Sequence, residues 1–229
     1  MAQATTDPGA RAPGRLTIKV VADFVCPWCY LGFNRMKRAL ARRPALRYRF
    51  IFQPFLLNPD TPSGGIPLRH YMSATAAGDP KRLLSGVIQA AALDGLPLDL
   101  SRIMVMPDST DAHRLVRWAG RIGDPAGNLQ SGLAGALYEA YFGTGLDIGR
   151  QSVLIRLAAG AGLDAAAAAD FLASNEDREA VRRDHHQARG MGIKGVPCFI
   201  IDGKYAISGA EDPEVFLPLL DLARVGEMA

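Results

Sequence analysis

The pattern of hydrophobic and polar residues predicts two β-strands near the start of the chain. Residues 16–23 are mostly apolar and β-branched, and residues 46–52 begin by alternating apolar with basic side chains. Both patterns are typical of strands with a buried face. Between them, residues 27–42 have the pattern of a helix, which Pro44 ends. Strand, helix and strand in this order form the opening of a parallel βαβ unit.

Strand patterns return near the end of the chain. Residues 196–201 are apolar, Asp202-Gly203 is a dipeptide typical of tight turns, and residues 204–208 supply an antiparallel partner. Asp212-Pro213 then opens a last helix, because Asp is a favourable cap and Pro is tolerated in a first helical turn. This part of the chain therefore predicts a ββα unit.

The region between these two parts carries helical patterns. The predicted helices are 67–76, 80–94, 111–123, 127–142, 150–160, 164–173 and 175–189. The predicted fold class is α/β, in the order βαβ…ββα, with a large all-helical insertion. One split sheet domain is predicted from residues 16–58 and 190–226, the insertion from residues 59–189, and a disordered leader from residues 1–15.

Composition narrows the function classes. Of 229 residues, 48% are hydrophobic and 21% charged, and the net charge is +3. The basic residues form short pairs, such as Arg42-Arg43, and no clustered stripe, so we expect no nucleic-acid partner. No apolar run reaches the ~18 residues of a membrane span, so we expect no membrane association.

The N-terminal residues and the cysteine count predict the compartment. Residues 1–15 contain prolines and glycines and no apolar segment of a signal peptide, which predicts a cytoplasmic protein. The cytosol is reducing, and the chain has three cysteines, Cys26, Cys29 and Cys198. An odd, small number of thiols argues against a framework of structural disulfides and favours catalysis, metal binding or simple burial.

The sequence Cys26-Pro27-Trp28-Cys29 follows a predicted strand and opens a predicted helix. Cysteines three residues apart at a helix start lie one turn apart and can close a disulfide. The N–H groups and the positive dipole at a helix N-terminus stabilise the thiolate of Cys26, which is the attacking species. Pro27 lies where its missing N–H has no cost, and Trp28 tunes the site without adding charge. Cys29, expected to be less exposed, can resolve a mixed disulfide.

A redox pair is favoured over a metal site or inert core cysteines. A zinc site needs a second pair of ligands at metal-ligand spacing, whereas Cys198 is single and the adjacent His185 and His186 point in different directions on a helix. We therefore expect no bound metal. We expect no cofactor beyond the redox-active disulfide itself.

Four segments together resemble the DsbA-like thioredoxin-fold oxidoreductases, specifically their FrnE-type branch. The segments are Asp23-Phe-Val-Cys-Pro-Trp-Cys-Tyr-Leu-Gly32, Phe55-Leu-Leu-Asn-Pro59, Ala112-His-Arg-Leu115 and Gly195-Val-Pro-Cys-Phe-Ile-Ile-Asp-Gly-Lys-Tyr-Ala-Ile-Ser-Gly-Ala210. The resemblance extends from about residue 16 to residue 224. It implies a thioredoxin-like fold with a helical insertion.

The resemblance also implies roles for individual residues. Cys26 would be the nucleophile and Cys29 the resolving thiol, and Pro197 would be a cis-proline beside them. Val196 would offer backbone hydrogen bonds to an extended substrate strand, a mode of capture that tolerates many sequences. The implied activity is dithiol–disulfide exchange or isomerisation on protein, peptide or small-thiol substrates, with glutathione as a candidate co-substrate. The oligomeric state is left open.

Three further residues allow two interpretations each. Asp23 either accepts the proton of Cys29 or caps the loop before Cys26. His113 is either an ordinary helix residue or tunes Cys26 electrostatically. Cys198 directly follows Pro197 and is either a small buried hydrophobic residue or a third thiol that traps Cys26.

Two other function classes remain as alternatives. One alternative is an enzyme similar to the kappa-class glutathione transferases and 2-hydroxychromene-2-carboxylate isomerases, which share the helical insertion. In that group a single nucleophile, often Ser, stands at the position of the first cysteine. The presence of both Cys26 and Cys29 argues against this group. The other alternative is a thiol-based holdase or sensor whose insertion binds exposed apolar segments.

Overall fold

The computed structural model describes residues 15–75, 80–122 and 129–225. The leader predicted for residues 1–15 lies outside the described residues except for Arg15. None of the helices in the described residues is both long and apolar enough to cross a membrane.

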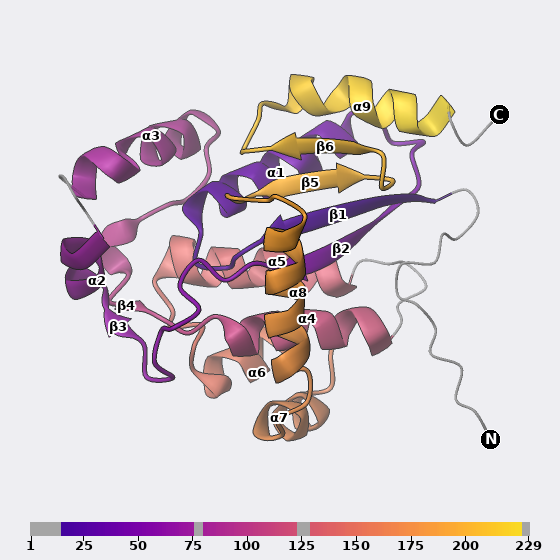
Figure 1. The fold of residues 1–229 in the computed structure, drawn as a ribbon. Coiled ribbons are helices and arrows are strands. Elements are labelled where there is room, and N and C mark those ends of the chain that lie inside the picture. Colours follow the sequence, from indigo (N-terminus) through magenta and orange to yellow (C-terminus); the bar gives the residue numbers. More distant parts are fainter. Residues whose placement is uncertain (1–14, 76–79, 123–128, 226–229) are drawn as a thin grey trace, which may run out of the picture.

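A four-stranded sheet forms the centre of the molecule. Its strands are β1 (Leu16–Ala22), β2 (Tyr48–Pro54), β5 (Cys198–Ile201) and β6 (Tyr205–Ser208). Their order is β2-β1-β5-β6; β1 and β2 are parallel, whereas β5 is antiparallel to both β1 and β6 (Figure 1). The predicted α/β arrangement is thereby confirmed, and β5 brings the C-terminal part of the chain directly beside β1.

Helices cover both faces of this sheet. On one face α1 (Pro27–Ala41) and α9 (Pro213–Val225) contact each other, and Phe199 of β5 packs edge-on against Phe216 of α9. On the other face lies α8 (Arg178–Gly190), which contacts β2 and crosses in front of the sheet in Figure 1. Because side chains alternate along a strand, Val20 and Phe199 join the larger core, whereas Val21 and Cys198 face α8.

The insertion contributes most of the remaining helices, close to the predicted positions. They are α2 (Leu68–Thr75), α3 (Pro80–Leu93), α4 (Thr110–Ile122), α5 (Leu129–Tyr138), α6 (Gln151–Gly160) and α7 (Ala165–Ala173). A short 3₁₀ helix, η1 (Leu100–Arg102), precedes α4, and a π-helical segment, η2 (Glu139–Gly143), continues α5. The predicted helix over residues 127–142 thus ends in a wider turn.

The insertion is not entirely helical, so the prediction was wrong on this point. Two short strands, β3 (Ile66–Pro67) and β4 (Val105–Met106), pair in antiparallel fashion. Each has only two residues, which is too short for an alternating pattern to be recognisable in the sequence. The backbone N–H of Leu68 also donates to the carbonyl of Met104 at 2.9 Å, so this ladder ties the start of α2 to the residues before α4.

Candidate active site

The helix α1 begins at the cysteine pair. Cys26 is the N-cap residue, with extended backbone angles, and its Sγ accepts the backbone N–H of Cys29 at 3.3 Å. Pro27 occupies the first helical position, where an N–H would have no helical partner. The sulfur of Cys26 therefore lies at the positive end of the helix and takes the place that a Ser or Asp oxygen usually occupies.

The two cysteines have different surroundings. Cys29 is 1% exposed, and burial, together with the neighbouring Cys26, raises its pKa well above the usual value of a thiol. Cys29 therefore keeps its proton at neutral pH. Cys26 is 4% exposed and caps the helix, and its neighbour Trp28 is 39% exposed. The two thiols thus differ chiefly in position, one at the helix cap and the other inside the first turn.

The loop before β5 lies against the cysteine pair. The Val196–Pro197 peptide bond is cis, and the thiol of Cys26 donates to the Val196 carbonyl at 3.7 Å. Gly32 of α1 permits this approach, because a Cβ atom there would lie 2.9 Å from Pro197 Cγ and 3.2 Å from Ala210 Cα. The structure thus brings Cys26 beside Val196 and Pro197, although Val196 lies 170 residues after Cys26 in the sequence.

Asp23 joins three of the segments that carried the family resemblance. Its Oδ2 accepts the backbone N–H of Leu57 at 2.7 Å, and its Oδ1 lies 3.2 Å from Nε2 of His113 on α4. The side chains of Asp23 and His113 are both buried. Asp23 thus holds the segment after β2, and its charge also acts on Cys29, whose pKa it raises. His113 thus contacts Asp23 inside the molecule.

His185 holds the neighbouring amide of the same segment. Its Nδ1 accepts the backbone N–H of Leu56 at 3.0 Å, and its ring packs edge-on against Phe55. Burial lowers the pKa of His185, so its ring is neutral at neutral pH. Asp23 and His185 together fix two successive amides in the segment after β2. The sequence reasoning considered His185 only as a metal ligand and missed this role.

Tyr138, at the end of α5, is a second insertion residue that contacts Asp23. Its hydroxyl donates to the backbone carbonyl of Asp23 at 3.3 Å, and its ring stacks on Tyr30 with centroids 5.7 Å apart. The same carbonyl accepts the N–H of Cys26 at 3.2 Å. The sequence offered no signal for Tyr138 beyond an aromatic-rich stretch, since its contact depends on how the insertion packs.

The remaining predicted residues lie at the edges of the site. Trp28 packs over α3, where Gly86 faces its ring. Cys198 lies in a small cluster with Val21, Phe55 and Ala188, and burial alone raises its pKa. Within the described part of the chain, burial is the cause that acts on the pKa of Cys198, whereas burial and then Cys26 raise the pKa of Cys29. This favours the interpretation of Cys198 as a buried apolar residue.

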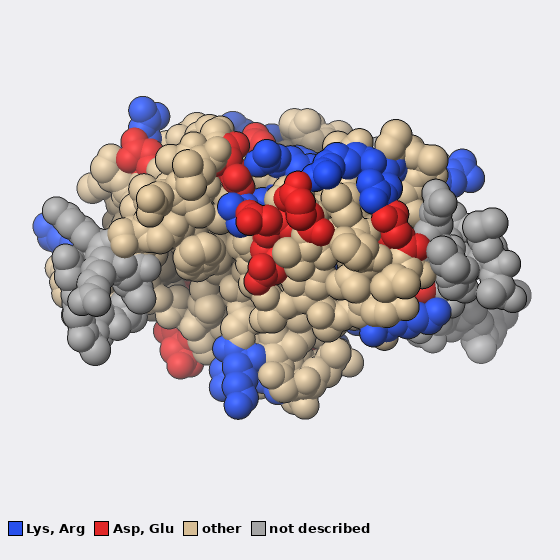
Figure 2. Space-filling model, turned by 90° about the horizontal axis from the view of Figure 1, so that it is seen from above, with Lys and Arg blue, Asp and Glu red and all other residues tan. Residues whose placement is uncertain are grey.

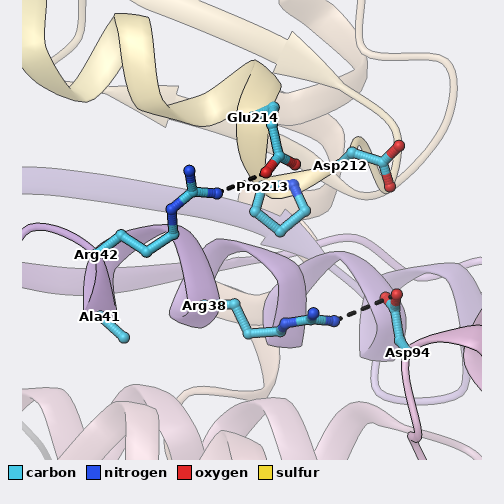
Figure 3. A pocket seen from close by; sticks show the side chains of 7 residues that line it. All are labelled: Arg38, Ala41, Arg42, Asp94, Asp212, Pro213 and Glu214. Atoms are coloured by element: carbon cyan, nitrogen blue, oxygen red, sulfur yellow. Dashed lines mark hydrogen bonds and ion pairs between the residues drawn. The ribbon is translucent and has the colours of Figure 1, made fainter.

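A surface hollow of about 440 Å³ lies elsewhere, between the second half of α1 and the start of α9 (Figure 3). Its charged groups are already paired: Arg42 with Glu214 at 2.6 Å and Arg38 with Asp94 at 3.2 Å. Viewed from above, the same side of the molecule shows acidic and basic side chains next to each other (Figure 2). Among the described residues, no group of three His, Cys, Asp or Glu side chains could hold a metal ion.

Comparison with known proteins agrees with this geometry. A model of the DsbA-like thioredoxin domain matches residues 17–221. The chain belongs to the DsbA-like thioredoxin domain family. A probable DsbA oxidoreductase from Streptomyces coelicolor is 28% identical, with a TM-score of 0.77 over 91% of this chain and 89% of that one. As a member of this family, the chain has a thioredoxin-like fold and is related to thiol oxidoreductases.

More distant solved structures share the fold. A cytosolic disulfide reductase, DsbM from Pseudomonas aeruginosa, solved with GSH, is 21% identical, with a TM-score of 0.59 over 91% of this chain and 96% of that one. A 2-hydroxychromene-2-carboxylate isomerase is 19% identical, with a TM-score of 0.65 over 93% of this chain and 97% of that one. The fold alone therefore does not separate disulfide exchange from this isomerase chemistry.

Proposed function

We propose that this protein is a thiol–disulfide oxidoreductase or isomerase of the FrnE-type branch, with Cys26 as nucleophile and Cys29 as resolving thiol. The observation that carries the proposal is the pairing of a cysteine N-cap on α1, held 3.7 Å from the Val196 carbonyl, with a second, buried cysteine one turn later. A helix N-terminus favours the thiolate of the first, and burial keeps the second protonated.

The reaction balances within the pair and its substrate. The Cys26 thiolate attacks one sulfur of a substrate disulfide, forms a mixed disulfide and releases the first substrate thiolate. Cys29 then loses its proton and attacks the Cys26 sulfur, which forms the Cys26–Cys29 disulfide and releases the second thiolate. Two electrons pass to the substrate, and the two leaving thiolates take up protons. The reverse sequence oxidises a dithiol.

Asp23 is the group proposed to take the proton of Cys29. The charge of its buried carboxylate raises the pKa of Cys29, and Nε2 of His113 lies 3.2 Å from that carboxylate. A carboxylate with a fixed hydrogen-bonding partner is a suitable general base. Asp23 would then combine both roles that the sequence allowed, since it also holds the Leu57 amide.

The substrates proposed are protein or peptide disulfides, with glutathione as a small-thiol co-substrate. The backbone carbonyl of Val196 lies beside Cys26, and backbone pairing at such a position suits an extended chain of any sequence. The DsbM reductase of P. aeruginosa, solved with GSH, supports a small-thiol partner. Its description as cytosolic agrees with the cytoplasmic location expected from the sequence.

The test is the fate of the mixed disulfide. Incubated with glutathione disulfide, Cys29→Ala is expected to accumulate one glutathione on Cys26, detectable by mass spectrometry, and to lose turnover on an insulin substrate. Cys26→Ser should form no adduct. Full activity of Cys29→Ala on a glutathione-conjugation or isomerisation substrate would favour the transferase or isomerase class. Protection of an aggregating client by a variant lacking both cysteines would favour the holdase.

A further inference from the structure

The turn after β6 continues the sheet beside the active-site loop. The backbone N–H of Gly209 donates to the carbonyl of Pro197 at 2.8 Å, which extends the β5–β6 ladder by one hydrogen bond. Gly209 adopts a φ of 103°, which favours glycine. The position of Pro197, and of Val196 before it, therefore depends on where the chain at Gly209 and Ala210 is held.

Arg35 of α1 holds this turn. Its Nη1 donates to the Ala210 carbonyl at 2.8 Å and lies 2.9 Å from Oδ1 of Asp212. Arg35 lies on the same face of α1 as Gly32, where a Cβ atom would lie 3.2 Å from Ala210 Cα. One guanidinium group therefore binds both the backbone and a side chain of the segment between β6 and α9.

The same guanidinium reaches the insertion. Its Nε donates to Oδ2 of Asp94 at 2.6 Å, and the Arg35 and Asp94 side chains are only 13% and 16% exposed. Asp94 directly follows α3, which packs against α1 and whose Gly86 faces the ring of Trp28. Arg35 therefore connects the helix that contacts Trp28, through the turn after β6, with the loop that contacts Cys26.

The chemistry of a guanidinium suits this junction. Its N–H groups point in fixed directions within one plane, so it can bind a carboxylate and a carbonyl at the same time, whereas a lysine ammonium is a point charge on a flexible stem. Hydrogen bonds from a charged donor are also stronger than neutral ones. A loop that is held before the substrate arrives lowers the ordering cost of binding, because the backbone that pairs with the substrate is already in place.

We infer that Arg35 is a positioning residue for substrate capture, which holds the Val196–Pro197 edge in place for backbone pairing with an extended chain. The inference rests on the proposed function and deepens it, since it makes exchange with a peptide disulfide depend on Arg35 more than exchange with a small disulfide. Arg35 transfers no proton and forms no bond to sulfur. The attack of Cys26 and the release of the substrate thiolate proceed as proposed above.

Two chromogenic disulfides that differ only in chain length test this inference. One is N-acetylcysteine amide and the other a peptide of about ten residues with a central cysteine, each joined through sulfur to thionitrobenzoate. Cys26 attacks the cysteine sulfur and releases the same coloured thiolate from both. In Arg35→Lys the rate constant for the peptide, divided by that for the small compound, is expected to fall about tenfold, as for loss of one hydrogen bond from a charged group.

The matched control is Arg38→Lys. Arg38 also lies on α1 and pairs with the same Asp94, at 3.2 Å, from a side chain that is 56% exposed. This variant should keep the wild-type ratio. Amide hydrogen exchange at Gly209, followed by NMR, should become faster in Arg35→Lys and stay unchanged in Arg38→Lys, because only the first variant loosens the turn that binds Pro197.

The outcomes separate the inference from the proposed function. A wild-type protein that releases no thiolate from either compound would overturn the oxidoreductase assignment, and the inference with it. Exchange with both compounds, but with the wild-type ratio in a folded Arg35→Lys variant, would overturn the inference alone. Equal slowing with both compounds would also overturn it, since this indicates a merely structural role, as would an equal fall of the ratio in Arg38→Lys.

Discussion

The two ends of α1 differ in how their polar groups are used. At the C-terminal end, Arg38, Arg42 and Arg43 lie at the surface, each paired with a carboxylate. At the N-terminal end, the groups are buried and few: two thiols, and one carboxylate in contact with one imidazole. Both arrangements agree with the helix dipole, which favours cations at one end and a thiolate at the other.

The surface hollow and the cysteine pair therefore lie at opposite ends of the same helix. The hollow beside Arg42 has a volume of about 440 Å³. Its charged side chains already form ion pairs with one another, and these exposed pairs are weakened by salt. The cysteine end has no comparable charge density. Its reactivity comes from position, namely a sulfur at a helix cap and a second sulfur under the insertion. Substitutions at the two ends should therefore have very different effects.

The largest effect is expected for Asp23→Asn, which removes the proposed proton acceptor. The resolving phase of exchange, in which Cys29 attacks the mixed disulfide at Cys26, should slow about a hundredfold, within the range for loss of a general base. The pH midpoint of that phase should move downward, because removal of a negative charge lowers the pKa of Cys29. Stopped-flow rates between pH 6 and 9 measure both quantities.

Asparagine retains an oxygen for the Leu57 amide, so the segment after β2 should stay in place. A resolving phase of wild-type rate would show that another group takes the proton and would reduce Asp23 to a structural residue.

The next effect concerns Gly32, which lets the loop of Pro197 approach α1. Gly32→Ala should lower the free energy of unfolding by about 1–2 kcal/mol, because overpacking costs more than the gain in helix propensity. The first phase of exchange, in which Cys26 attacks the substrate disulfide, should slow as Pro197 moves away from Cys26. Denaturant unfolding and stopped-flow kinetics test the two parts.

Gly132→Ala in α5 is the control, since a Cβ there meets no atom within 4 Å. It should raise the free energy of unfolding by about 0.5–1 kcal/mol and leave exchange unchanged. Equal behaviour of the two variants would disprove the close contact at Gly32.

A smaller effect is expected from His185, which is neutral in the folded protein. Its pKa is lowered by folding, so the unfolded chain binds a proton that the folded chain does not. The stability that depends on neutral His185 is therefore present above the ordinary histidine pKa of about 6.5 and is lost as pH falls below it. Thermal unfolding of wild type and His185→Gln between pH 5 and 7.5 should show a shallower pH dependence in the variant; parallel curves would contradict this account.

The smallest effect is expected at the other end of α1. Arg42→Gln breaks the ion pair between Arg42, whose side chain is 50% exposed, and Glu214, whose side chain is 68% exposed. The variant should unfold and exchange disulfides like wild type, since exposed pairs contribute little. A marked loss of activity in Arg42→Gln would show that the hollow participates in the reaction and would contradict the comparison.

The sequence alone predicted the structural features that depend on residues close together in the chain. The strands, most helices and the placement of Cys26 and Cys29 at a helix start follow from local patterns, and they agree with the structure. The contact of Pro197 and Val196 with the cysteine pair came from the family resemblance. Other contacts between distant segments were not predicted, because the hydrogen bonds from the Tyr138 hydroxyl to the Asp23 carbonyl and from the Leu56 N–H to His185 depend on how the insertion packs. The two-residue strands β3 and β4 carry no periodicity at all.

Asp23 lies between these two cases. Its position three residues before Cys26 suggested either a base or a cap, and only the fold shows that its carboxylate holds Leu57 and contacts His113 while acting on Cys29. A residue with several partners cannot be assigned one role from spacing alone, because each partner comes from a different part of the chain.

The central claim is that Cys26 and Cys29 form one redox couple. The most direct test is equilibration of the protein in glutathione buffers of graded potential, with the disulfide detected by mass spectrometry after thiol alkylation. The account predicts a single two-electron transition that disappears in Cys26→Ser and in Cys29→Ala and keeps its midpoint in Cys198→Ser. Absence of a transition in the wild-type protein, or a transition that requires Cys198, would contradict it.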